Sequence, residues 1–345
     1  MSDQLRKLLS ATLLLFVFLP ACGDPPQASP DASSQPEPEP PTVATSAEYE
    51  WSVDEGIVYG KALSHAGDFH GETTEEVDLE GDLYVPEDDG EGRRPGLLII
   101  HGGGFLFGSR TQEELVEFAE YFAARGWVVF SVDYRLLNDH GTQPTVWSEM
   151  AEETTSNSSR AELGKAMYPA VRDGKAAARW MQANAEEYRL APDRIAVLGA
   201  SAGAHIAVAL ATTEPEDFRD ELDAEQDPTL TTTHLDESGE VAALVNLWGG
   251  ADAVDGVSDA FGGPSRWDAT DAPALIVHGT DDKIVPVANG KEIRDRYQST
   301  GVAHSFVTIE GEGHGPWKAT VDGQNLRQLA EGFLLEQMAV GPDAP

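Results

Sequence analysis

A serine between small residues stands at the centre of the sequence G-A-S-A-G, which spans residues 199–203. It follows an apolar run at 195–198 and precedes a helix-favouring run at 202–211. A G-x-S-x-G sequence in this setting makes a sharp turn from strand to helix, and its neighbours must be small because larger side chains would collide with both elements. The turn exposes a hydroxyl near a helix N-terminus, so we predict that Ser201 is a nucleophile.

A second glycine-rich sequence, H-G-G-G-F at 101–105, follows the apolar run 97–100. Glycines let backbone N–H groups approach a substrate oxygen closely, and a tetrahedral intermediate needs two or three such donors aimed at its developing negative charge. We expect Gly103 and Gly104 to supply two of these donors and Ala202 to supply the third. The three residues are therefore predicted to form an oxyanion hole beside the nucleophile.

The two motifs together resemble the α/β-hydrolase superfamily, in its HGGG-type esterase/lipase branch. The sequence D-Y-R-L at 133–136 and the stretch 168–205 are similar to acetyl xylan esterase-like and feruloyl esterase-like members. The resemblance covers most of residues 51–338, and it implies hydrolysis of carboxylic esters without a cofactor. Ala204 departs from it, since the closest relatives carry a further glycine there, and its methyl group is expected to alter the packing beneath the turn.

The resemblance also implies a catalytic carboxylate after a later apolar run. Residues 278–286 match the family pattern H-G-x-x-D-x-x-V-P, in which the acid is Asp282. Its role would be to orient a histidine and to stabilise the charged form of that histidine. The neighbouring Asp281 and the more distant Asp252 are the alternatives.

The base is expected after the final predicted strand. The run 307–309 leads into G-E-G-H-G, where the flanking glycines let a short loop carry the imidazole of His314 over the nucleophile. His314 would take the proton of Ser201 and later return it to the leaving alcohol. The order Ser201, Asp282, His314 is the chain order that this fold uses.

The chain has nine histidines, so a single one is weak evidence for a site. The chain order of nucleophile, acid and base favours His314 over His304 and His205. His101 and His278 are expected to brace the loops on which they lie.

Alternating strand-like and helix-like segments must position these residues. Short apolar runs predict strands at 97–101, 128–132, 195–200, 241–248, 274–278 and 306–309. Helices are expected at 112–125, 169–188, 202–211, 288–299 and 325–338. Continuous hydrophobicity is typical of strands that are covered on both faces, so the predicted class is α/β, an α/β-hydrolase fold with a mostly parallel central sheet and helices on both faces. A further strand at 77–85 is expected to be antiparallel.

Two acidic stretches, 138–167 and 213–240, interrupt this alternation. Long insertions in a compact domain are usually functional loops or disordered surface segments. The first contains Trp147 and Met150, which would either help to cover a binding cleft or lie on a plain surface excursion.

Residues 1–21 are typical of an export signal, with Arg6 and Lys7 before an apolar run at 13–19 that is too short to span a bilayer. The only cysteine of the chain, Cys22, ends the sequence L-P-A-C, which resembles the lipobox of bacterial lipoproteins. In that family the cysteine receives a lipid. We therefore expect an exported lipoprotein of the bacterial cell envelope, held at the outer membrane or facing the periplasm. The alternative is an ordinary signal peptide with an incidental cysteine.

Residues 23–48 contain seven prolines among serine, alanine and acidic residues. Such a composition buries little apolar surface and favours extended conformations. We therefore predict a linker at 22–50, which holds the body away from the membrane, and a catalytic domain at 51–340.

Charge limits the partners of the protein. The chain has 60 Asp and Glu residues against 23 Lys and Arg residues, a formal net charge of −37. A surface this acidic repels nucleic acid and other polyanions. The expected partner is a small-molecule or carbohydrate ester, and the lipid anchor at Cys22 is the expected link to a membrane. No histidine and carboxylate cluster has the spacing of metal ligands, so no metal site is predicted.

Two other functions share some of these features. A serine peptidase of the prolyl-oligopeptidase type has the same turn and the same order of residues, but the H-G-G-G sequence and the lack of a preceding propeller-like repeat argue against it. A catalytically silent surface protein that binds a glycan or a partner is disfavoured because every predicted site position carries a competent residue.

Overall fold

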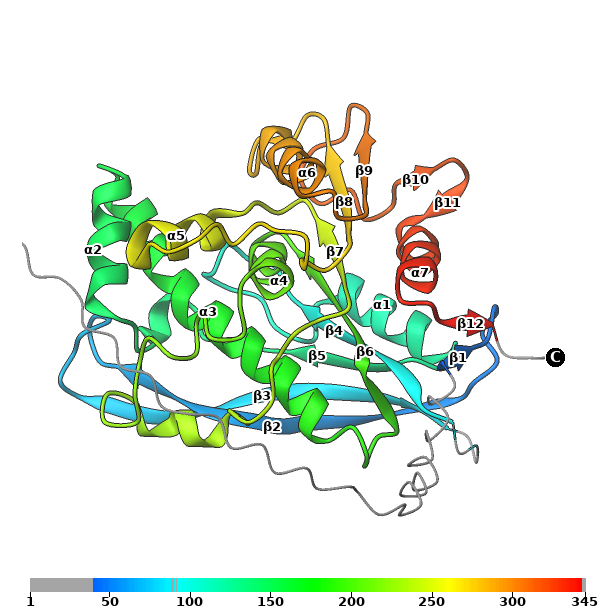
Figure 1. The fold of residues 1–345 in the computed structure, drawn as a ribbon, viewed down its shortest axis with the longest axis horizontal. Coiled ribbons are helices and arrows are strands. Elements are labelled where there is room, and N and C mark those ends of the chain that lie inside the picture. The colour runs from blue at the N-terminus through cyan, green and yellow to red at the C-terminus, as the bar shows by residue number, and fades with distance from the viewer. Residues whose placement is uncertain (1–39, 88–89, 91, 343–345) are drawn as a thin grey trace, which may run out of the picture. The chain divides into compact units, whose positions relative to one another are not determined.

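The computed structural model describes residues 40–87, 90 and 92–342. Their centre is an eight-stranded sheet in the order β2-β3-β5-β4-β6-β7-β8-β9 (Figure 1). β2 (Trp51–His65), β3 (Thr74–Pro86) and β5 (Val128–Val132) pair antiparallel with one another in that order. The remaining pairs are parallel, and their further strands are β4 (Arg94–Ile100), β6 (Leu190–Ala200), β7 (Ala243–Leu247), β8 (Ala274–Gly279) and β9 (His304–Ile309). The mostly parallel sheet and the antiparallel strand over 77–85 are thus confirmed.

Side chains along β4 alternate between two apolar cores, one on each face of the sheet. Leu98 and Ile100 belong to the first core, whereas Leu97 and Ile99 belong to the second, as the two-residue period of a strand requires. Helices cover both cores (Figure 1). The first core includes residues of α3 (Ser158–Ala183), α4 (Ala202–Thr212), α5 (Asp252–Phe261) and α6 (Val287–Thr300), and the second those of α1 (Glu113–Ala123) and α7 (Leu326–Gln337). The expected covering of both faces is confirmed.

The helices α1, α4, α6 and α7 begin and end within two residues of the expected bounds, but α3 does not. It runs from Ser158 to Ala183, whereas the sequence suggests 169–188. Pro169 suggests a helix start because proline suits a first turn, yet here it lies inside the helix. The true N-terminus is capped by Asn157, whose side chain accepts a hydrogen bond from the Arg160 N–H at 3.1 Å.

The insertion expected at 138–167 is mostly helical, because it contains α2 (Thr145–Thr154) and the first turns of α3. Trp147 of α2 is buried and packs against Tyr168, Phe218 and Phe261. Its indole N–H donates to the Gly164 carbonyl at 2.9 Å. Trp147 therefore belongs to the packed interior, and neither a cleft cover nor a surface excursion describes it.

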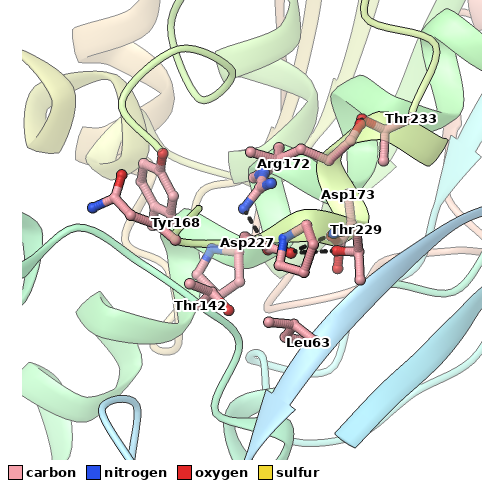
Figure 2. Close-up of polar contacts among 12 residues, drawn as sticks. Leu63, Thr142, Tyr168, Arg172, Asp173, Asp227, Thr229 and Thr233 are labelled. Atoms are coloured by element: carbon pink, nitrogen blue, oxygen red, sulfur yellow. Dashed lines mark hydrogen bonds and ion pairs between the residues drawn. The ribbon is translucent and has the colours of Figure 1, made fainter. Parts of the chain in front are cut away.

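The second insertion, 213–240, is joined to α3 by buried polar contacts (Figure 2). Arg172 Nη1 donates to Asp227 Oδ2 at 3.1 Å. The other carboxylate oxygen of Asp227 accepts hydrogen bonds from the Thr229 N–H at 3.0 Å and from the Thr229 hydroxyl. Arg179 Nε donates to the Thr233 carbonyl at 2.8 Å. These contacts hold the insertion against the body, because a buried charge requires a partner.

β2 and α5 are not among the elements that the sequence indicates. β2 mixes exposed, half-buried and buried side chains, and its pairing with β3 has irregular register after Asp54 and Val58. Such interruptions hide the two-residue period. The short helix α5 follows directly on the loop after β7, where two glycines precede it.

The body begins earlier than the expected boundary at residue 51. β1 (Thr42–Val43) pairs in parallel with β12 (Gly341–Pro342), and the side chain of Val43 is buried in the second core. An apolar residue at this position explains why the last part of the expected linker packs on the body. The signal at 1–21, Cys22 and the linker up to residue 39 lie outside the described residues. Within the described part of the chain, no helix has the length and hydropathy needed to cross a bilayer.

Candidate active site

The turn between β6 and α4 holds Ser201 in a backbone conformation with φ 54° and ψ −118°. Residues other than glycine rarely adopt this region, which is typical of functional turns. A Cβ atom on Gly199 would lie 2.1 Å from the Gly203 carbonyl oxygen, and one on Gly203 would lie 2.2 Å from the Ile100 carbonyl oxygen. The glycines of the G-x-S-x-G sequence are therefore required by close backbone contacts.

Ala204 packs beneath this turn against the loop that follows β7. Its side chain is fully buried, and a Cβ atom on Gly249 would lie only 2.4 Å from the Ala204 Cβ. The room for the Ala204 methyl group is thus provided by a glycine on the opposing loop. This explains how the chain tolerates alanine where the resemblance favours glycine.

His314 lies between a buried carboxylate and the turn at 199–203 that holds Ser201, called the nucleophile turn below. Its Nε2 is 2.8 Å from Ser201 Oγ, and its Nδ1 is 2.7 Å from Asp282 Oδ2. The imidazole side chain is 21% exposed, so solvent and substrate can reach it. The structure brings together the three side chains that the sequence selects, from three loops at the carboxyl ends of β6, β8 and β9.

The carboxylate of Asp282 is held in one orientation by backbone donors. Its side chain is 0% exposed, and Oδ1 accepts hydrogen bonds from the N–H groups of Ile284 at 2.8 Å and Val285 at 3.0 Å. Neither alternative acid takes this place, because Asp281 is exposed and Asp252 lies beside His205.

His278 and His101 hold the loops on which they lie. His278 Nε2 donates to the Val285 carbonyl at 2.8 Å, and His101 Nδ1 donates to the Gly102 carbonyl at 2.7 Å. The His101 ring also stacks on Tyr134 with 4.3 Å between the ring centroids. Burial lowers the pKa of both histidines, so both rings are neutral near pH 7 and act as single donors.

The H-G-G-G loop lies against the nucleophile turn. A Cβ atom on Gly102 would be 3.3 Å from the Ser201 Cβ, and Gly103 has a φ of 116° with no room for a side chain beside the Phe107 carbonyl. Gly104 has a φ of 62° and open space where a side chain would be. Across the turn, Ala202 is the first residue of α4, and the first N–H groups of a helix have no partner within the helix.

The D-Y-R-L sequence after β5 is held by buried polar contacts. Arg135 donates to the buried carboxylate of Asp173 through Nε at 2.9 Å and through Nη2 at 2.6 Å, and its backbone N–H donates to the same group at 2.9 Å. Asp133 accepts from the Arg110 N–H at 2.6 Å. These contacts fix the loop after β5, because a bidentate pair restricts both partners.

Some residues of the site are not selected from the sequence. The buried ring of Trp248 lies edge-on to His314, with 6.5 Å between centroids, and edge-on to Trp317 at 4.7 Å. Trp248 ends an expected strand and gives no local sign of its role. His205 and Asp252, which the sequence offers only as alternative base and acid, lie beside each other. Among the described residues, no group of three or more potential ligands is placed to hold a metal ion.

Residues 81–149 and 158–261 match the family model BD-FAE, and together they make up half of the chain. The chain belongs to the BD-FAE family. The part that matches contains Ser201, both glycines of the expected oxyanion hole and Ala202. Asp282 and His314 lie beyond the matched part of this BD-FAE chain. Their assignment to the site therefore rests on the geometry described above for Ser201, Asp282 and His314.

Curated relatives of this BD-FAE protein include esterases. It is 24% identical over 249 residues to Esterase LipC of Mycobacterium tuberculosis, and this similarity covers 64% of this chain and 53% of LipC. It is 33% identical over 118 residues to Carboxylesterase NlhH of the same species, and this similarity covers 34% of this chain and 28% of NlhH. The chain thus spans about half the length of the first of these relatives and less of the second.

A solved structure with a similar fold is the propionate-bound form of the thermophilic esterase Est2 of Thermogutta terrifontis. The TM-score is 0.56 and the sequence identity 25%, and the similarity covers 84% of this chain and 96% of Est2. This likeness is one of overall fold. The expected α/β-hydrolase fold is confirmed.

Proposed function

We propose that this protein is a serine hydrolase that cleaves carboxylic esters through an acyl-enzyme. The observation that carries the proposal is the position of His314, with one ring nitrogen 2.8 Å from Ser201 Oγ and the other 2.7 Å from the Asp282 carboxylate. This arrangement lets one imidazole draw a proton from a hydroxyl while a buried charge stabilises the cation that forms. The names of the curated relatives support an ester as the substrate.

The reaction has two steps of the same kind. Ser201 Oγ attacks the ester carbonyl carbon while its proton passes to His314 Nε2, and the N–H groups of Gly103, Gly104 and Ala202 stabilise the oxyanion. The intermediate then expels the alcohol, which takes the proton from His314. A water molecule next gives its proton to His314 and attacks the acyl carbon. Loss of the acid returns the proton to Ser201.

The substrate is proposed to be a short-chain or carbohydrate-linked ester. Est2, which has a similar fold, is described with propionate bound. Leu106 and Phe107, which follow the expected oxyanion glycines, are exposed apolar side chains, and Phe107 is 68% exposed. Apolar side chains at this place suit the acyl chain of an uncharged ester, and the net charge of −37 disfavours anionic polymers.

Replacement of the nucleophile tests the proposal. Ser201→Ala should lower the turnover of p-nitrophenyl acetate by at least about a thousandfold and abolish labelling by a fluorophosphonate probe, because the attacking oxygen is lost. Ser299→Ala is the matched control, since Ser299 is an exposed serine on α6. Circular dichroism should show the same fold for both variants. Substantial turnover by Ser201→Ala would disprove the assignment.

We also propose that Cys22 carries a lipid and holds the protein at the bacterial cell envelope. The support is the sequence alone: an apolar run, the L-P-A-C sequence and the placing of the only cysteine. The full chain expressed in a bacterial host should partition into the detergent phase and incorporate a labelled fatty acid. Cys22→Ser should abolish both. Fatty-acid labelling that survives in Cys22→Ser would contradict the proposal.

A further inference from the structure

A second pair of a histidine and an aspartate lies next to the nucleophile turn. His205 is on α4, and its Nδ1 is 2.9 Å from Oδ2 of Asp252, the first residue of α5. The interaction with His205 lowers the pKa of Asp252, so this carboxylate is ionised at neutral pH. The mechanism above uses neither residue.

The backbone of His205 lies one helical turn from that of Ser201. Its backbone N–H donates to the Ser201 carbonyl at 3.2 Å. Side chains on a helix point back toward its N-terminus, so the imidazole is directed toward the end of α4 that follows Ser201. The ring also lies edge-on to Phe105 of the H-G-G-G-F loop, with 6.4 Å between centroids. His205 therefore lies in the first turns of α4, beside the expected oxyanion loop.

The loop after β7 packs closely against this ring. A Cβ atom on Gly250 would be 2.8 Å from His205 Cε1 and 2.9 Å from Asn289 Nδ2. Glycine at this position lets the imidazole, the Asp252 carboxylate and the Asn289 amide converge. Three elements, α4, α5 and α6, thus direct polar groups to one place at the carboxyl end of the sheet.

The contact with Asp252 determines which nitrogen of His205 carries the proton. The negative charge of this carboxylate, 2.9 Å from Nδ1, favours the neutral form of the ring that is protonated at Nδ1 and has its lone pair at Nε2. Within the described part of the chain, no hydrogen bond joins Nε2 to another residue. The residue is 7% exposed, and its Nδ1 is buried, whereas Nε2 is not among the buried side-chain atoms without a partner, so Nε2 is the nitrogen that is left for a bound molecule.

We propose, on the basis of the esterase function proposed above, that His205 Nε2 accepts a hydrogen bond from a hydroxyl of the substrate, next to the ester group. The hydroxyl is one or two carbons from the ester, because His205 lies one turn from Ser201. It belongs either to the alcohol half, as in a monoacylated vicinal diol, or to the acyl half, as in a hydroxy acid ester. Asp252 is the positioning residue, because it holds the tautomer that accepts.

Pairs of substrates in which a methoxy group replaces the hydroxyl test this inference. The first arm compares 2-hydroxyethyl butyrate with 2-methoxyethyl butyrate, and the second compares methyl glycolate with methyl methoxyacetate. The methoxy compounds keep the oxygen but cannot donate a hydrogen bond. In one arm, the wild-type protein should show a kcat/KM about five- to tenfold higher for the hydroxy ester, which is the size of one hydrogen bond. The arm that shows the preference identifies the half of the substrate.

Two variants separate a specific contact from a structural role. His205→Phe should bring the ratio of the two kcat/KM values to about one, because the acceptor is lost. Asp252→Asn should also reduce the ratio, because the amide can donate to Nδ1 and so move the ring proton to Nε2. Asp259→Asn, which removes an exposed carboxylate from the same helix, should keep the wild-type ratio.

The outcomes distinguish this inference from the proposed function. A wild-type protein that cleaves p-nitrophenyl acetate but shows no preference in either arm would overturn the inference alone. A preference that persists in His205→Phe or in Asp252→Asn would overturn it as well. A wild-type protein that cleaves no ester at all would overturn the proposed function and the inference together.

Discussion

His314 Nδ1 and Asp282 Oδ2 are 2.7 Å apart, although their residues lie in separate loops after β9 and β8. The carboxylate side chain is 0% exposed and accepts two further backbone hydrogen bonds, so it has little freedom to turn. A fixed carboxylate keeps the proton of the neutral imidazole on Nδ1 and leaves Nε2 free to accept the proton of Ser201.

Asp282→Asn should lower the kcat of ester cleavage by about 10⁴-fold with little change of fold, because an amide can donate to Nδ1 and leaves the wrong tautomer. Asp281→Asn is the control, since its neighbouring carboxylate is exposed and should be dispensable. Steady-state kinetics with p-nitrophenyl acetate measure both. Equal losses in the two variants would show that Asp282 has no special role.

Gly199→Ala should destabilise the protein by about 3 kcal/mol, since its methyl group would lie 2.1 Å from a backbone oxygen that cannot move without opening the turn. Gly332→Ala is the matched change on α7, where nothing lies within 4 Å of the added atom. It should stabilise the helix by about 0.5–1 kcal/mol. Urea unfolding measures both, and a Gly199→Ala protein as stable as the wild type would contradict the close contact.

Asp227→Ala should lower the free energy of unfolding by about 3–5 kcal/mol, because it leaves the buried guanidinium of Arg172 without its charge partner. Burial lowers the pKa of Arg172, whereas the Asp227 carboxylate raises it and so favours the charged form. Asp236→Ala, an exposed change in the same insertion, should alter stability by no more than about 0.5 kcal/mol. Thermal unfolding followed by circular dichroism tests this, and similar melting temperatures would argue against the anchoring role.

Burial raises the pKa of Asp271 to about 7. The folded protein therefore binds a proton more tightly than the unfolded chain, whose Asp271 titrates near the ordinary value. The stability contributed by this proton is fully present below about pH 4 and is lost as the pH rises to about 7.

Asp271→Asn cannot ionise, so the variant should gain about 1 kcal/mol relative to the wild type at pH 8, with allowance for partial solvent screening. At pH 4 it should gain little. Melting temperatures of both proteins at the two pH values measure the difference. The same gain at both pH values would mean that ionisation of Asp271 is not its cause.

The sequence by itself selected the residues that the structure brings together at Ser201. The G-x-S-x-G turn and the H-G-G-G loop are each formed by consecutive residues. The glycines that each backbone conformation requires therefore stand next to one another in the sequence. The central strands can also be predicted from the sequence, because strands covered on both faces are apolar along their whole length. For the same reason the strand at 128–132 has the predicted bounds.

Only the tertiary structure decided which side chains meet. It placed Asp282 rather than Asp281 beside His314, and Asp252 beside His205. It also showed that Trp147 of the first insertion is buried against Phe218 of the second. It also moved the start of α3 to Ser158 and showed that Thr42–Val43 pack on the body as β1. Periodicity along a chain indicates which face of an element is buried, but the partner on that face comes from a distant part of the sequence and depends on how the elements pack.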